Sequence, residues 1–139
     1  MRSIGVAQRA LQALIERASA RTVFGKPIIT RANTQDVIAE STLEIEQCRL
    51  LTLHAATMID KLGSKGAFSH IAMIKIAAPR MACRVIDRAI QVFGAAGVSQ
   101  DSWLAYAYAS QRTLRIADGP DEAHLMTLAK TVIKQSSKL

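Results

Sequence analysis

Residues 34–62, TQDVIAESTLEIEQCRLLTLHAATMIDKL, decide the fold, because one face of this stretch repeats at helical spacing over its whole length. Successive members of that face are three or four residues apart: Ile38, Ser41, Ile45, Cys48, Thr52, Ala55, Ile59 and Leu62. Residues at this spacing lie on one side of an α-helix. The two polar members, Ser41 and Thr52, are small enough to fit in a packed seam. The stretch therefore predicts a helix of about eight turns that packs lengthwise against other helices.

Further helices are predicted on both sides of this seam. Together they cover residues 3–23, 34–62, 67–93, 102–116 and 120–136. The third is apolar around most of its circumference, which indicates burial on several sides. No segment has the alternation of a strand, and the loops are short enough to make consecutive helices antiparallel neighbours. The sequence predicts an all-α protein, one domain over residues 1–139, with an up-down-up-down helical bundle.

Composition excludes several classes of function. The net charge is +7, but the basic residues form no run of five and only six residues are aromatic, so a solvated basic surface is favoured over nucleic-acid binding. No segment reaches the roughly 18 apolar residues of a membrane span. Cys48 and Cys83 fit buried, reduced thiols, and His54, His70 and His124 have no metal-ligand spacing. No metal site is predicted.

Three short segments are unusual for a plain bundle. They are residues 21–27 (RTVFGKP), 91–97 (QVFGAAG) and 115–122 (RIADGPDE). Each has an ordinary structural interpretation when taken alone: a helix that ends at a glycine, a satisfied buried amide before a turn, and an acidic cap at a helix start. Only their order and separation along the chain indicate something more than a plain helical bundle.

Taken together, the three segments resemble the C-terminal domain of acyl-CoA dehydrogenases. The family pattern is an arginine followed by Phe-Gly-Lys, then a Gln-x-x-Gly-Gly-x-Gly stretch, then a carboxylate-Gly turn before the last helix. The chain matches it with Arg21 and Phe24, with Gln91 and Gly94, and with Asp118-Gly119. The resemblance covers essentially the whole chain and implies a flavoenzyme that uses FAD to oxidise acyl-CoA thioesters to 2-enoyl-CoA.

The resemblance also implies roles for individual residues. Asp118 matches the catalytic carboxylate that removes the α-proton of the thioester, and the backbone at Gly119 would hold the thioester carbonyl. Arg21 matches an arginine on the pyrophosphate of an FAD held mainly by a neighbouring subunit. The remaining cofactor-binding positions implied are Phe24 near the adenine, the segment of Gln91, Gly94 and Ala95, and Pro120 and Glu122 beside the flavin.

The chain departs from the common pattern at several positions. Asp118 stands where most members have glutamate, Ala32 where a glutamine is usual, and Ala95 where a second glycine is usual. An aspartate is one methylene shorter, which changes the geometry of proton transfer. Two phrases, residues 73–80 (MIKIAAPR) and 117–122 (ADGPDE), are similar to the branch of family members ten and eleven, in which aspartate is normal at this position.

The last three residues, Ser137-Lys138-Leu139, match a peroxisomal address read by an import receptor. The sequence therefore predicts a peroxisomal protein, with the mitochondrion as the alternative location. The partners implied by the resemblance are an acyl-CoA substrate, the N-terminal and middle domains of a parent enzyme, further copies in a tetramer, and an electron acceptor for the reduced flavin.

Two other functions stay open at this stage. The long seam and the apolar third helix also suit a non-catalytic helical assembly module. Within the enzyme class, the same domain of an oxygen-using acyl-CoA oxidase is the competitor.

Overall fold

The computed structural model describes residues 1–137, and α-helices dominate it. The helices are α1 (Arg2–Ala20), α2 (Ala32–Gly66), α3 (Phe68–Phe93), α4 (Ala95–Val98), α5 (Leu104–Thr113) and α6 (Asp121–Ser136). Two short strands, β1 (Thr22–Val23) and β2 (Lys26–Pro27), and one 3₁₀ turn, η1 (Ile28–Thr30), join α1 to α2. The predicted all-α class is confirmed, and the two last residues lie outside the described part of the chain.

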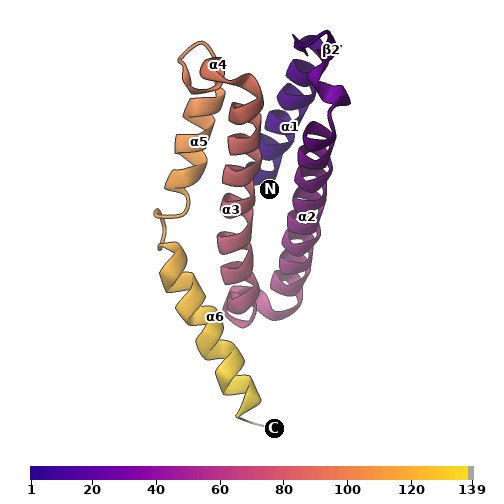
Figure 1. Ribbon diagram of the computed structural model, residues 1–139. Helices are drawn as coiled ribbons and strands as arrows, with labels where there is room; N and C mark the ends of the chain where they lie inside the picture. The colour runs from indigo at the N-terminus through magenta and orange to yellow at the C-terminus, as the bar shows by residue number, and fades with distance from the viewer. Residues whose placement is uncertain (138–139) are drawn as a thin grey trace.

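The helices run up, down, up and down (Figure 1), as predicted. The fourth segment of the bundle consists of two helices. α5 and α6 follow one another in roughly the same direction past α3 and do not fold back as a pair. The expectation that all consecutive helices are antiparallel neighbours is therefore wrong for these two. Their connection, residues 114–120, does not reverse the chain, so it projects from the side of the bundle.

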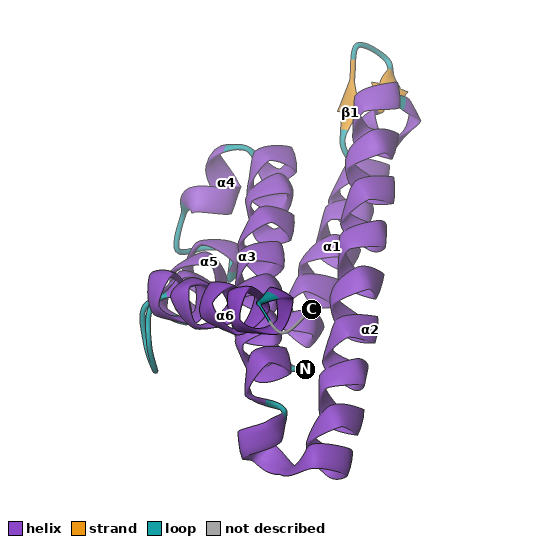
Figure 2. Ribbon diagram, turned by 90° about the horizontal axis from the view of Figure 1, so that it is seen from below, coloured by secondary structure: helices purple, strands orange, loops and turns teal. Residues whose placement is uncertain are grey.

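The central helix is α3, which contacts α1 and α2 on one side and α5 and α6 on the other (Figure 2). Its buried residues include Met81, Val85 and Ile86, each fully enclosed. Small residues dominate the rest of the core, such as Ala7 and Ala10 of α1, and they allow the helices to approach closely. The predicted burial of α3 on several sides is confirmed.

The predicted seam of α2 is buried from Ser41 to Ala55. Ser41 Oγ donates to the carbonyl of Val37 at 2.7 Å, and Thr52 Oγ1 donates to the carbonyl of Cys48 at 2.7 Å. Both polar members are therefore satisfied within their own helix. Leu62, the last predicted member of the seam, is exposed.

The end of the first helix differs from the prediction. The helix was expected to continue to Val23 with no strand in the chain, but α1 ends at Ala20 and a small hairpin follows. Phe24 and Gly25 at its tip have φ angles of 52° and 77°. Positive φ at both central residues is the mark of a tight hairpin turn that suits the twist of its strands. Strands of two residues leave no periodicity in a sequence, so the pattern could not predict them.

Other helix boundaries also differ, and the four-residue helix α4 was not predicted. α2 begins at Ala32, before the predicted start at residue 34, with Arg31 as its N-cap and no side-chain cap. α5 covers only Leu104–Thr113 of the predicted residues 102–116. The missing turn at its end is the connection to α6, where the candidate site lies.

Candidate active site

The connection between α5 and α6 is built around the ammonium group of Lys75, which reaches it from α3. Lys75 Nζ donates to the backbone carbonyls of Leu114 at 2.6 Å, Ala117 at 2.9 Å and Gly119 at 3.3 Å. The last carbonyls of a helix have no partner in the helix itself. Lys75 supplies that partner after α5 and holds the chain on both sides of Asp118.

The backbone at the centre of this turn is unusual. Asp118 has φ 55° and Gly119 has φ 93°. Left-handed backbone costs about 1 kcal/mol or more for a residue with a Cβ, although aspartate tolerates it better than most. Such a conformation persists only where surrounding contacts enforce it.

A buried ion pair fixes the end of the turn. Asp121 begins α6, and its Oδ2 accepts hydrogen bonds from Arg80 Nε at 2.9 Å and Arg115 Nε at 2.8 Å. Its side chain is 4% exposed, while the two arginines are about one-third exposed. Burial alone would raise the pKa of Asp121, but the two guanidinium groups outweigh it and hold the pKa below its usual value. The start of α6 is thereby tied to α3 through Arg80 and to the connection itself through Arg115.

His124 closes the turn from the first turn of α6. Its Nε2 lies 3.2 Å from the carbonyl oxygen of Asp118, so the tautomer with a proton on Nε2 donates to that oxygen. A Cβ at position 119 would lie 3.0 Å from the same His124 nitrogen. Glycine therefore suits this position for its φ angle and for the space.

The carboxylate of Asp118 is exposed, and no described side chain donates to it. Pro120 and Glu122 beside it are also exposed. A carboxylate fixed in place by its backbone and open on its other side is suited to accept a proton from a bound molecule. This chain alone does not shield the carboxylate from water.

The second predicted group gathers at the opposite end of the bundle. Arg21, Gln91, Gly94 and Ala95 line one hollow of about 350 Å³, together with Arg17, Val92, Phe93 and Ala96. Gln91 is exposed, so the alternative that it is a buried, satisfied amide is wrong. Gly94 ends α3 with φ 67°, and a Cβ there would meet nothing within 4 Å. Two guanidinium groups beside open backbone form a surface that suits an anionic group such as a phosphate.

Phe24 stands at the tip of the hairpin, apart from this lining. Its side chain is 94% exposed, the highest value among the large apolar residues of the described chain. Arg31 supports the hairpin: it donates to the carbonyl of Val23 at 3.0 Å, and its guanidinium carbon lies 5.7 Å from the centre of the Phe24 ring. The phenyl ring is thus presented outward on a short ribbon.

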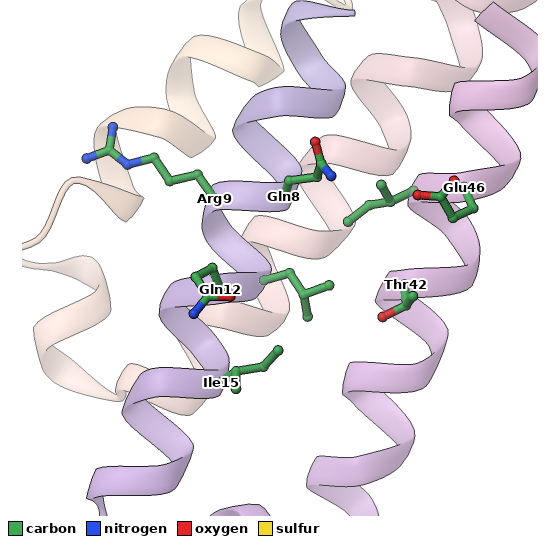
Figure 3. Close-up of a pocket in the computed structure, with 8 residues that line it drawn as sticks. Gln8, Arg9, Gln12, Ile15, Thr42 and Glu46 are labelled. Atoms are coloured by element: carbon green, nitrogen blue, oxygen red, sulfur yellow. The ribbon is translucent and has the colours of Figure 1, made fainter. Parts of the chain in front are cut away.

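The structure does not bring the two predicted groups together. The hairpin and the end of α3 lie at the top of the bundle in Figure 1, while the turn with Asp118 projects from its side lower down. A larger hollow, of about 470 Å³, lies between α1 and α2 (Figure 3). Its lining includes Gln8, Gln12 and Thr42 but none of the predicted site residues, and we assign it no chemistry.

Sequence reasoning missed the residues that support Asp118. Lys75 lay inside a noted phrase without a role, and Asp121 was interpreted only as an acid at a helix start. Arg80, Arg115 and His124 were not paired with anything. The partners of Lys75 and His124 are backbone carbonyls, and Arg80 and Arg115 share the carboxylate that begins α6. Only a basic residue in an apolar helix, as at Lys75, gave a signal.

Within residues 1–137 the structure holds no cluster of three potential metal ligands. None of the described helices is long and apolar enough to span a membrane.

Comparison with known proteins gives one family. The family model described as acyl-CoA dehydrogenase, C-terminal domain, matches residues 1–133. Acyl-CoA dehydrogenase family member 11 of Rattus norvegicus is 52% identical over 99% of this chain, which corresponds to 18% of the rat protein. The chain thus spans about a fifth of the length of that relative.

Comparison with solved structures agrees with this family. An acyl-CoA dehydrogenase-like chain from Mycobacterium abscessus superposes with a TM-score of 0.95 at 45% identity, over 98% of this chain and 33% of its own. The FAD complex of PigA superposes with a TM-score of 0.85 at 29% identity, over 94% of this chain and 33% of its own.

Proposed function

The chain belongs to the acyl-CoA dehydrogenase family, and from that premise we propose that it is the catalytic C-terminal domain of a parent enzyme that oxidises acyl-CoA thioesters to 2-enoyl-CoA. The observation that carries the proposal is Asp118, an exposed carboxylate held on a fixed turn, which the sequence resemblance matches to the family's catalytic carboxylate. The proposal extends to a whole enzyme of which this chain is a part.

In the proposed reaction, the carboxylate of Asp118 removes the α-proton of the thioester and becomes a carboxylic acid. The electron pair of the α C–H bond forms the new carbon–carbon double bond as a hydride leaves the β-carbon. FAD, when bound, supplies the acceptor for that hydride. The amide N–H groups of Asp118 and Gly119 donate to no other described residue, so they are available to the thioester carbonyl as negative charge develops on it.

The two arginines at the hollow at the top of the bundle support a contact with the pyrophosphate of an FAD held by a neighbouring subunit. Arg21, with Arg17 beside it, would meet the pyrophosphate, and Gln91, Gly94 and Ala95 would bring open backbone close to the same cofactor. Phe24 would lie against the adenine ring, where its exposure in this chain is relieved. Pro120 and Glu122 would lie beside the flavin of the chain's own site.

The outer faces of the helices support assembly with other domains and copies. Apolar side chains stay exposed along α2 and α6: Leu43, Leu50, Leu125, Met126, Val132 and Ile133. Patches of this kind mark surfaces that are covered in the complete protein. We propose that N-terminal and middle domains and a tetrameric arrangement cover them. The same observation favours the second candidate function, a non-catalytic assembly module.

The remaining elements of the proposal follow from the family and the C-terminal tripeptide. A separate electron acceptor would reoxidise the reduced flavin. Residues 137–139 would direct the protein to peroxisomes through the import receptor, with the mitochondrion as the alternative. Only Ser137 of these three residues lies within the described part of the chain.

The test uses the complete parent protein with its native cofactor. Its visible spectrum is recorded without oxygen, and acyl-CoA thioesters of increasing chain length are then added. The proposal predicts a yellow flavin that bleaches with one chain-length class. Absence of flavin, or a flavin that no thioester bleaches, would support the assembly module. Rapid recovery of the colour when oxygen is admitted would instead indicate an acyl-CoA oxidase.

A further inference from the structure

The ammonium group of Lys75 makes contacts that the packing of α3 against its neighbours does not require. It lies in the N-terminal third of α3, a largely apolar helix, yet its side chain ends on a segment 39 to 44 residues further along the chain. Its three N–H groups meet three carbonyl oxygens, at 2.6, 2.9 and 3.3 Å. An ammonium group has three donors and no acceptor, so these contacts use its full hydrogen-bonding capacity.

The three carbonyls are distributed around Asp118. Leu114 is the C-cap of α5, Ala117 directly precedes Asp118, and Gly119 directly follows it. Lys75 therefore holds the peptide unit directly before Asp118, through the carbonyl of Ala117, and the unit directly after Gly119, through the Gly119 carbonyl. The unit between Asp118 and Gly119 carries the Asp118 carbonyl, which meets His124. Rotation of the unit before Asp118, which would carry the Asp118 carboxylate elsewhere, breaks a charge-assisted hydrogen bond to Lys75.

The backbone at this point needs such support. Asp118 and Gly119 both have positive φ, and the aspartate would relax to a common conformation in a free loop. The positive charge of Lys75 also lies where the carbonyl dipoles at the end of α5 converge, which is where a helix favours a cation. Lys75 thus stabilises the helix end and the strained turn together.

The other anchors of the connection act at a different place. Asp121, Arg80 and Arg115 hold the start of α6, beyond the turn, and His124 contacts only the carbonyl of Asp118. Loss of Lys75 would leave α6 docked but release the backbone on both sides of Asp118.

From these contacts we infer that Lys75 is a positioning residue that fixes the turn 114–119 in the one conformation that aims the Asp118 carboxylate at its substrate. The inference rests on the proposed function, because it assigns Lys75 to the same proton transfer. A displacement of about 1 Å between reacting groups lowers a rate by about 100-fold. Loss of Lys75 should therefore slow the proton-transfer step without removing the cofactor or the substrate.

The experiment measures anaerobic flavin reduction by rapid mixing, in the complete FAD-containing protein, with the thioester that bleaches the wild type. Lys75→Met keeps an unbranched apolar stem that is one atom shorter than lysine and removes the donors. We expect a reduction rate per bound flavin lower by roughly 10- to 100-fold, with unchanged flavin content and thioester Kd. Lys75→Arg, which keeps donors and charge, should recover part of the rate. Lys61→Met, on the exposed side of α2, is the matched control and should match the wild type.

A double variant separates positioning from simple structural support. In an Asp118→Asn background, Lys75→Met should lower the rate no further, because there is no carboxylate left to position. A wild-type rate for Lys75→Met, or an equal further loss in the Asp118→Asn background, overturns the inference. If Lys75→Met and the milder Lys75→Gln both yield no folded protein, Lys75 supports the whole bundle, and the inference is also overturned. A wild-type protein that no thioester reduces refutes the proposed function instead, so the two failures are distinguishable.

Discussion

Two turns of this chain have the same backbone feature, positive φ at two consecutive residues, but different contacts support them. At the hairpin tip, Phe24 and Gly25 both have positive φ, and so do Asp118 and Gly119 between α5 and α6. The hairpin is held by its own two-residue strands and by Arg31. The turn with Asp118 is held by Lys75 of α3, by the ion pairs of Asp121 and by His124.

The turn with Asp118 is completed by contacts within this chain, whereas the hairpin tip is left open to contact another molecule. A two-stranded ribbon is marginal in isolation, and a phenyl ring that is 94% exposed gains nothing from its own fold. The turn with Asp118 is already anchored by contacts from α3 and α6. We therefore expect substitutions at the turn to affect chemistry and stability, and substitutions at the hairpin tip to affect only the binding of the partner.

The largest effect is expected from Asp118→Asn in the complete protein. The amide keeps the shape of the side chain but cannot accept the α-proton, so the rate of flavin reduction should fall by about 1,000-fold. Flavin content and thermal stability should stay at wild-type values, because no described side chain donates to the Asp118 carboxylate. Rapid mixing with the preferred thioester gives the rate. A rate within a few-fold of wild type would remove Asp118 from the role of base.

A smaller effect, on stability, is expected from Asp121→Ala. It leaves Arg80 and Arg115 without their shared carboxylate. Loss of one member of a fully buried pair costs roughly 3–5 kcal/mol, and the partial exposure of the two arginines reduces this to about 2 kcal/mol. Chemical denaturation measures the change, and Asp101→Ala, at an exposed position before α5, is the control.

The same ion pair predicts a pH dependence with a definite sign. The pKa of Asp121 in the folded chain lies below its usual value of 3.8. Its contribution to the free energy of unfolding is therefore complete above about pH 4 and is lost as the pH falls through the lower, folded pKa. Asp121→Ala should flatten this part of the pH profile. An unchanged acid limb in the variant would show that other carboxyl groups dominate it.

The smallest effect on stability is expected from Phe24→Ala. The ring is nearly free of contacts in the chain, so the free energy of unfolding should change by less than about 0.5 kcal/mol. If the ring stacks on an adenine, FAD affinity should fall by about tenfold. Titration of flavin-free protein with FAD gives that affinity, and Tyr106→Ala, an exposed aromatic residue on α5, is the control. A large loss of stability with unchanged FAD affinity would remove the distinction between the two turns.

Most of the fold could be predicted from the sequence, because helices that pack together need small or apolar residues at regular spacing. The seam from Ser41 to Ala55 and the apolar circumference of α3 could both be read from spacing alone. The hairpin could not, because two-residue strands have no period, and the shared direction of α5 and α6 depends on a turn whose shape Lys75 sets from far away in sequence.

The site residues also fall into those that the sequence could predict and those that it could not. Asp118, Arg21 and Gln91 were located because they stand in motifs, and the structure gathers Arg21 and Gln91 at one hollow. Their roles remain predictions. Of the supporting residues, Lys75 and Arg80 contact residues far along the chain, and Arg115 and His124 make contacts across the turn. These contacts depend on the packing of α3 and α6, so only Lys75, a basic residue in an apolar helix, gave a signal in the sequence.

The most direct test of this account is an experimental structure of the complete protein with FAD and a thioester analogue that cannot be oxidised. The account predicts that residues 114–121 keep the conformation described here, with Lys75 on the same three carbonyls. It also predicts the Asp118 carboxylate about 3–3.5 Å from the α-carbon of the analogue and Phe24 against the FAD of another subunit. A turn that rearranges on binding, or an Asp118 carboxylate directed away from the α-carbon, would contradict it.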